Sequence, residues 1–167
     1  MLNPFFKNTG PYKINHLLKL IDFKDQNFLD TTINDVKDLY ESQEGDISFF
    51  HSKKYMDLAQ ATKASFCITT ENLKPFLPKT CKVIISQNVL LHTAQITKIF
   101  YPDSVTDDFD RTVDDINNTK FKEKVNFGKN VLIGKNVKIG KKSNVASNCI
   151  IESNVVIGEN CVIGPFS

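Results

Sequence analysis

The chain has 167 residues, of which 41% are hydrophobic and 24% are charged, and its formal net charge is +2. This length and composition predict one globular domain or two small ones, and they argue against a disordered, collagen-like or coiled-coil chain. Arg111 is the single arginine among 21 basic residues, which argues against a nucleic-acid partner, because bidentate recognition of phosphate and guanine relies on arginine.

The sequence also lacks the marks of export and of a metal site. No apolar run approaches the roughly 18 residues of a membrane span, and the first residues do not form a signal peptide. The cysteines at 67, 81, 149 and 161 form no C-x-x-C pair, so the zinc and redox motifs are absent. We therefore expect buried, reduced thiols, a cytoplasmic location and no cofactor.

Residues 1–102 have the pattern of a small α/β domain. Short runs rich in β-branched and aromatic residues predict strands at 46–50, 65–70 and 81–86. Apolar residues at helical spacing predict helices at 14–21, 54–62 and 89–100, the last ended by Pro102. Strands that alternate with helices predict a small sheet with helices packed on it.

Residues 103–118 have few large apolar side chains and many aspartates. These are Asp103, Asp107, Asp108, Asp110, Asp114 and Asp115. Because such a segment buries little surface, we expect an acidic linker or surface loop.

From residue 119 onward an apolar anchor recurs at every sixth position. The anchors are Phe121, Phe127, Ile133, Ile139, Val145, Ile151, Ile157 and Ile163. A second, smaller set stands two residues before each anchor from Phe127 onward: Val125, Val131, Val137, Ser143, Cys149, Val155 and Cys161. Since strand side chains alternate, both sets point to the same side.

The corners of this repeat carry residues that tolerate bends. Glycine follows most anchors, and asparagine occupies the corner at 130, 136, 148, 154 and 160, with Lys142 as the exception. We expect both residue types to supply the positive φ of a sharp turn. A strict hexapeptide repeat of this kind predicts a parallel β-helix for residues 119–167.

Two resemblances follow from these motifs. The repeat resembles the left-handed β-helix of the hexapeptide acyltransferases, in which three hexapeptides make one coil. The stretch Gly45-Asp-Ile-Ser-Phe-Phe-His-Ser-Lys-Lys-Tyr55, followed by Thr62-Lys-Ala-Ser-Phe-Cys-Ile, resembles the nucleotide-binding domain of the UDP-3-O-acylglucosamine N-acyltransferase (LpxD) family. The resemblance implies a uridine-nucleotide-binding domain at 1–102, the linker at 103–118, and the start of a left-handed β-helix at 119–167.

The LpxD resemblance also implies a binding site. In that family the motif's Phe and Tyr sandwich the uracil ring and its Asn hydrogen-bonds the base, so the expected stackers are Phe49 and Tyr55. Ser52 stands in the Asn position and is shorter, with one rotatable donor. Lys54 matches the family's Lys and is expected to approach a phosphate. The alternative for the two aromatic residues is a plain core position.

The three histidines, His16, His51 and His92, all lie before the repeat. In the resembling family a histidine on the β-helix is the general base that takes a proton from the attacking sugar amine. The resemblance therefore implies a catalytic residue in later coils, no catalytic residue in this chain, and binding without turnover. His51 is a poor substitute because the acyl-transfer centre is elsewhere. A zinc site of the hexapeptide carbonic-anhydrase type would need histidines on the repeat.

The resemblance implies the substrates and partners as well. The full enzyme would move a 3-hydroxyacyl group from acyl carrier protein to the 2-amine of UDP-3-O-acylglucosamine in lipid A biosynthesis, as a homotrimer. The repeat is rich in lysine, at Lys120, Lys122, Lys124, Lys129, Lys135, Lys138, Lys141 and Lys142. These form a solvated face or a docking surface for the acidic carrier protein.

Two other functions stay open from the sequence. One is a non-catalytic β-helical scaffold or oligomerisation module, and the other is a different nucleotide-sugar acyltransferase of the hexapeptide class. The 167-residue chain is expected to be the N-terminal part of a longer enzyme, with further coils that carry the histidine. An early stop in the downstream reading frame would favour the scaffold instead.

Overall fold

The computed structural model describes residues 5–23, 28–105, 109–119, 121 and 124–167. Asp107, Asp108, Lys120 and Lys122, which belong to the predicted linker and basic stretch, lie outside the described residues. The chain divides into two compact units, which are described separately: one is Phe6–Thr106, and the other is Asp107–Ser167 together with Met1–Phe5. Within the described ranges no helix is long and apolar enough to cross a membrane.

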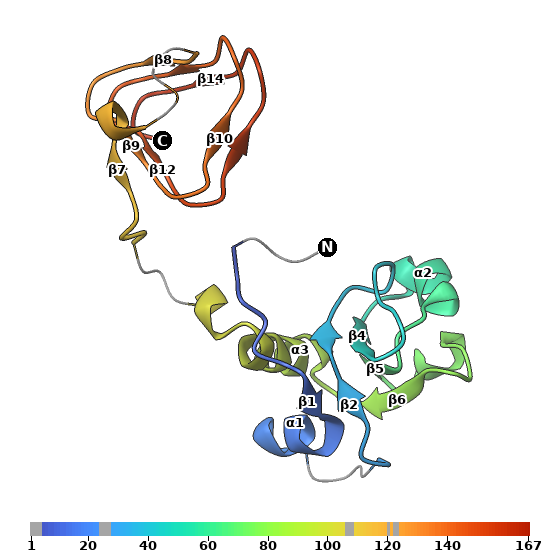
Figure 1. Cartoon of the computed structure of the whole chain (residues 1–167). Helices are drawn as coiled ribbons and strands as arrows, with labels where there is room; N and C mark the ends of the chain where they lie inside the picture. Colours follow the sequence, from blue (N-terminus) through green and yellow to red (C-terminus); the bar gives the residue numbers. More distant parts are fainter. Residues whose placement is uncertain (1–4, 24–27, 106–108, 120, 122–123) are drawn as a thin grey trace. The chain divides into compact units, whose positions relative to one another are not determined.

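The N-terminal unit is built on a four-stranded parallel sheet in the order β3-β4-β5-β6 (Figure 1). The strands are β3 Asp35–Val36, β4 Asp46–Phe50, β5 Phe66–Thr69 and β6 Lys82–Ile85. A separate antiparallel pair joins β1 Tyr12–Lys13 to β2 Thr32–Ile33. The three predicted strands are confirmed as β4, β5 and β6, whereas β1, β2 and β3 have only two residues each and give no periodic signal.

Helices cover both faces of this sheet, as the α/β pattern predicts. One core joins Ile47, Phe66 and Ile84 of the sheet to α1, Ile14–Leu20, and α3, Val89–Phe100. The other face packs Phe50 and Cys67 against α2, Met56–Ala61. Three 3-10 turns complete the unit: η1 Lys53–Tyr55, η2 Lys74–Phe76 and η3 Pro102–Val105. The helix predicted at 54–62 is therefore split into η1 and α2.

Two residues of the N-terminal motif have structural roles in the turn before β4. Gly45 has φ +90°, and a Cβ there would lie 2.5 Å from Asn34 Nδ2, so the position requires glycine. Asp46 is 4% exposed and its Oδ2 accepts a 2.9 Å hydrogen bond from the Gln43 backbone N–H. Lys37 Nζ lies 3.6 Å from the same oxygen, which compensates the buried charge. These contacts fix the start of β4.

The C-terminal unit confirms the parallel β-helix of hexapeptide repeats (Figure 1). Strands eighteen residues apart pair in parallel, so that β11 lies between β8 and β14, β12 pairs with β9, and β13 pairs with β10. The strands are β8 Asn126–Phe127, β9 Leu132–Ile133, β10 Lys138–Ile139, β11 Asn144–Val145, β12 Ile150–Ile151, β13 Val156–Ile157 and β14 Val162–Ile163. Three hexapeptides therefore make one coil.

The two inward sets of the repeat form one core. Val125, Val131 and Val137 of the smaller set lie in the same cluster as anchors such as Ile133 and Val145. Ser143 of the smaller set is fully buried, and its hydroxyl donates to Gly158 O at 2.8 Å and accepts from the Cys161 N–H at 3.1 Å. The polar exception is thus hydrogen-bonded, as buried hydroxyls must be.

The expected role of the corner residues is confirmed for asparagine and wrong for glycine. Asn130, Asn136, Asn148, Asn154 and Asn160 all have φ between +55° and +66°, and Lys142 has φ +61°. Gly45 is the positive-φ glycine of the described chain, so the repeat glycines are not selected for φ. A Cβ at Gly128, Gly134 or Gly140 would instead lie 2.4 Å from a backbone nitrogen of the next coil. Glycine is required there for space.

The segment expected as an acidic linker lies against the β-helix over residues 110–118. β7, Asp114–Asp115, pairs antiparallel with β9, and η4, Ile116–Asn118, follows it. Asp110 Oδ2 accepts hydrogen bonds from the Ser153 N–H at 2.7 Å and from its hydroxyl at 2.5 Å. These bonds, with those from Thr112, hold the pKa of the Asp110 carboxyl well below its usual range despite partial desolvation. Asp110 thus attaches this segment to the β-helix through Ser153.

Candidate ligand-binding site

The sequence-predicted stackers Phe49 and Tyr55 line one hollow of about 300 Å³ in the N-terminal unit. Its other walls are His51 and a group from two separate segments, Asp38, Leu39, Tyr40 and Leu58. This volume is at the lower end of the range for small-molecule pockets, which run from roughly 300 to 1,000 Å³. Aromatic walls with a few polar groups suit a flat, partly polar ligand.

The parallel sheet places this hollow at its carboxyl edge. Phe49 is the fourth residue of β4 and His51 follows the last, so the two side chains leave the strand on the same side. The chain then turns through η1, which ends at Tyr55. Leu39 and Tyr40 follow β3, the neighbour of β4. Ligands of open α/β sheets bind outside the carboxyl ends of the strands, and these residues lie there.

Three rings stand in a row along the hollow. The centroids of Phe49 and His51 are 6.2 Å apart with planes 24° apart, and those of His51 and Tyr55 are 5.7 Å apart with planes 46° apart. Tyr55 is 37% exposed, whereas Phe49 is half-buried against the core that holds α1 and α3. The interpretation of Phe49 as purely a core residue is therefore incomplete, because one side of its ring faces the hollow.

Ser52 and Lys54 lie in and next to η1 and, unlike the stackers, do not line the hollow among the described residues. Ser52 is the N-cap of η1, and its Oγ accepts a 3.3 Å hydrogen bond from the Lys54 N–H. Lys54 Nζ lies 5.8 Å from the centroid of the Tyr55 ring, within reach of a cation–π contact. Neither side chain is among the described residues that line the hollow. Ser52 stabilises the turn that ends at Tyr55, and Lys54 contacts the Tyr55 ring.

His51 also borders a second hollow of about 310 Å³, next to the start of α3. Its remaining walls are Thr70, Gln87, Asn88, Val89, Leu90 and Leu91. The two hollows share His51 and no other lining residue.

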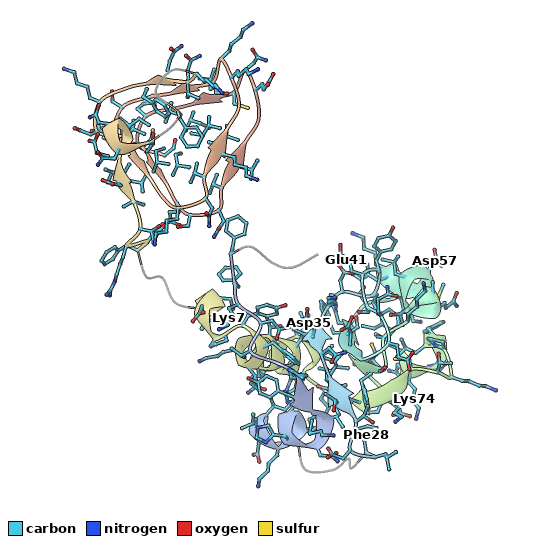
Figure 2. All side chains as sticks on the ribbon, viewed as in Figure 1. Lys7, Phe28, Asp35, Glu41, Asp57 and Lys74 are labelled. Atoms are coloured by element: carbon cyan, nitrogen blue, oxygen red, sulfur yellow. The ribbon has the colours of Figure 1, made fainter. Side chains whose placement is uncertain are left out.

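Sequence reasoning missed Asp38, Leu39, Tyr40 and Leu58 because they lie outside the Gly45–Tyr55 motif. The exposed Tyr40, with 78% of its surface accessible, is held by a turn in which Asp38 Oδ1 accepts 2.8 Å hydrogen bonds from the N–H groups of Tyr40 and Glu41. No strand was predicted at residues 35–36. Had β3 been recognised there, its pairing with β4 would have indicated that the turn at residues 38–41 lies near the end of β4. Figure 2 shows how the side chains of this unit, among them Asp35, Glu41 and Asp57, are distributed over its elements.

The other two histidines lie outside the walls of this hollow, and His16 is exposed whereas His92 is half-buried. His16 stacks on Tyr12 with a centroid distance of 6.3 Å. His92 Nδ1 lies 2.8 Å from Ser86 Oγ, and that oxygen also accepts the Asn88 N–H at 2.9 Å, next to the first turn of α3. Among the described residues no group of three or more His, Cys, Asp or Glu could hold a metal ion.

One family model matches the part of the chain that forms this hollow. The model for UDP-3-O-(3-hydroxymyristoyl) glucosamine N-acyltransferase, LpxD, matches residues 30–99. Residues 30–99 of the N-terminal unit are therefore similar to this family. The match runs from before β2 to near the end of α3 and so includes every wall of the hollow. Bacterial transferase hexapeptide repeats, six in number, match residues 130–165.

Two curated relatives are named as UDP-3-O-acylglucosamine N-acyltransferases. The chain is 27% identical over 110 residues to UDP-3-O-acylglucosamine N-acyltransferase 2 of Legionella pneumophila, which covers 63% of this chain and 31% of the relative. It is 30% identical over 96 residues to UDP-3-O-acylglucosamine N-acyltransferase of Acinetobacter baylyi. That match covers 56% of this chain and 26% of the relative. The resemblance to this family of acyltransferase enzymes is confirmed, and the chain spans less than a third of the length of these relatives.

Proposed function

We propose that this chain is part of an N-acyltransferase and that its LpxD domain binds the uridine of UDP-3-O-acylglucosamine. The observation that carries the proposal is that Phe49 and Tyr55, six residues apart, border a single hollow. Base stacking on aromatic side chains stabilises complexes by about 1–3 kcal/mol per base. Phe49 is anchored in the sheet and Tyr55 is exposed, so one wall is rigid and the other is open to an incoming ring.

The proposed reaction of the whole enzyme is transfer of a 3-hydroxyacyl group from acyl carrier protein to the 2-amine of the bound sugar, in lipid A biosynthesis. The attacking amine must lose a proton to a general base, and residues 119–167 contain no histidine. We therefore expect this chain by itself to bind the nucleotide without turnover. The exposed lysines of the first coils, which include Lys129, Lys135 and Lys141, are the proposed contacts for the acidic carrier protein.

The β-helix is the proposed surface for a homotrimer, and the left-handed winding is proposed from the resemblance to hexapeptide acyltransferases. The outward positions of the last strands carry exposed apolar side chains: Ile150 is 53% exposed, Val156 71% and Val162 76%. These residues stand on three different sheets, so each sheet presents one outward apolar side chain to a neighbouring copy. Light scattering of the 18.9 kDa chain tests this, with three times that mass expected at high concentration. A clean monomer would count against the trimer.

Calorimetric titration of the 167-residue chain with UDP-GlcNAc tests the binding half of the proposal. We expect saturable binding, and Tyr55→Ala should weaken it by about 5- to 100-fold, the affinity equivalent of one lost stacking contact. Phe109→Ala is the matched control, because Phe109 is an aromatic residue with 70% of its surface exposed in the other unit. Its affinity should equal that of the wild type.

Two results would contradict the proposal. One is the absence of binding at millimolar UDP-GlcNAc, and the other is binding that Tyr55→Ala leaves unchanged. The expected lack of turnover has its own test, in which acyl carrier protein with a 3-hydroxyacyl chain and UDP-3-O-acylglucosamine are added to the chain. N-acylated product above the uncatalysed rate would show that a base other than a β-helix histidine acts.

A further inference from the structure

His51 has chemical features that its role as a wall of the hollow does not use. Its ring is exposed, and within the part of the chain that the structure describes no hydrogen bond to either ring nitrogen is present. A neutral imidazole offers one donor and one acceptor. Of the three rings along the hollow, His51 is the one that carries ring nitrogens, whereas Tyr55 carries one hydroxyl and Phe49 has no polar atom.

The imidazole lies between the two predicted stackers in the order of the chain and lines the same hollow. Rings that are stacked in direct contact have atoms about 3.5–4.0 Å apart. The Phe49 and His51 centroids are 6.2 Å apart with planes 24° apart, and those of His51 and Tyr55 are 5.7 Å apart with planes 46° apart, so neither pair of centroids is as close as in a direct face-to-face stack. His51 therefore lines the same hollow as both predicted stackers and lies next to each of them.

Ser52, the residue in the motif's Asn position, is poorly placed for this contact. Its oxygen accepts the Lys54 N–H and so caps η1, and the side chain is absent from the described walls of the hollow. Turning this hydroxyl toward a base would remove the cap that sets the turn before Tyr55. Its neighbour His51 has a longer side chain and no such structural bond.

We propose that His51 is the residue that recognises the uracil edge in this chain, and that Ser52 does not. An imidazole nitrogen accepts a hydrogen bond from the N3–H of the base, the one donor on that edge, while Phe49 and Tyr55 hold its faces. The inference rests on the proposed function, since it names the polar contact within the same uridine site. It assigns the specificity for uracil to His51, which is neither one of the two predicted stackers nor the residue in the motif's Asn position.

The test compares UMP with 3-methyl-UMP, which lacks the N3–H, on the whole 167-residue chain. Wild type should bind 3-methyl-UMP about three- to tenfold more weakly than UMP, the effect of one net hydrogen bond. His51→Ala should weaken UMP by the same factor and should bind the two ligands equally. His51→Phe keeps a ring of similar size without nitrogens and should behave in the same way. Ser52→Ala should match wild type within about twofold.

The outcomes separate this inference from the proposed function. If wild type does not bind UMP, the proposed function fails and the inference fails with it. If wild type binds UMP and both His51 variants keep its preference for UMP over 3-methyl-UMP, the inference alone is refuted. Tighter UMP binding by His51→Ala would also refute it, because the imidazole would then obstruct the base. Thermal melting of each variant checks the fold, which an exposed residue should leave unchanged.

Discussion

The glycines of the hexapeptide repeat make a quantitative prediction at Gly140. A Cβ built there lies 2.4 Å from Glu159 N, 2.5 Å from Gly158 C and 2.6 Å from Gly158 O. All three atoms are backbone of the next coil, so no flexible side chain can move aside. Gly140→Ala must therefore separate two coils at this corner.

The chain also contains one corner that has a Cβ at the glycine position. Corner hydrogen bonds over Gly128, Gly134 and Gly140 measure 2.8, 2.9 and 3.0 Å. At the corner where Ala146 takes the glycine position, the equivalent bond from Phe166 N to Ser147 O measures 3.4 Å. The bond at this corner is the longest of the four.

The expected cost of Gly140→Ala follows from three contributions. Overpacking costs about 1–3 kcal/mol, and weakening of the Asn160 N to Lys141 O bond costs about 0.5–1.5 kcal/mol. The reduced entropy of the unfolded chain offsets about 0.4–1 kcal/mol. The net loss is about 2 kcal/mol, which corresponds to roughly 30-fold in an opening equilibrium.

Amide hydrogen exchange is the appropriate assay, because the chain has no tryptophan and its four tyrosines all precede the repeat. We expect the exchange of the Asn160 amide to rise about 30-fold in Gly140→Ala. Gly158→Ala is the matched control, since its Cβ would meet only Cys161 Sγ at 3.7 Å, and it should change exchange by less than about twofold. Equal effects of the two substitutions would refute the argument from space.

Three further predictions concern single side chains. Lys142→Asn should stabilise the β-helix by about 0.5–1 kcal/mol, measured by thermal melting, because Lys142 has φ +61° and asparagine tolerates that region; no change in the melting midpoint would count against it. The lowered pKa of Asp110 means that its bonds to Ser153 are intact above the usual carboxyl pKa of about 3.9 and are lost as pH falls through the folded value. Exchange of the Ser153 amide should rise in acid, and Asp110→Asn should abolish that dependence. Burial, with a 2.7 Å hydrogen bond to Asp35, raises the pKa of Tyr101 to about 12, so ultraviolet titration should show one late tyrosine that Tyr101→Phe removes.

The β-helix could be predicted from sequence because its signal repeats. Each anchor contributes the same evidence for an inward position, and the positive φ at Asn130 and its equivalents follows from residue type alone. The role of the glycines could not be predicted in the same way. Space is set by the residues eighteen positions later, so Gly140 and Gly158 look identical in sequence, although among the described residues only the Gly140 Cβ position meets the backbone of a later coil.

The docking of residues 110–118 was hidden by composition. Aspartates with few apolar neighbours favour a solvated loop, and that rule counts residue types without their partners. Asp110 occupies space that Gly134 leaves free, since a Cβ on Gly134 would lie 2.6 Å from Asp110 Oδ2. The missing side chain and the docked carboxylate are thus two parts of one contact, and neither part gives a signal in its own segment.

The residues of the candidate site also differ in how far the sequence predicts them. Phe49 and Tyr55 could be predicted because the motif contains both. Tyr40 follows β3, and it lines the same hollow because β3 pairs with β4 in the sheet. His51 stood within the motif, yet the sequence offered it only as an unsuitable catalyst. Its candidate role emerges from two distances to rings and from the bond that commits Ser52 to the turn. A departure from a family motif is therefore best interpreted with its neighbours, because an adjacent residue on the same edge can take over a lost hydrogen bond.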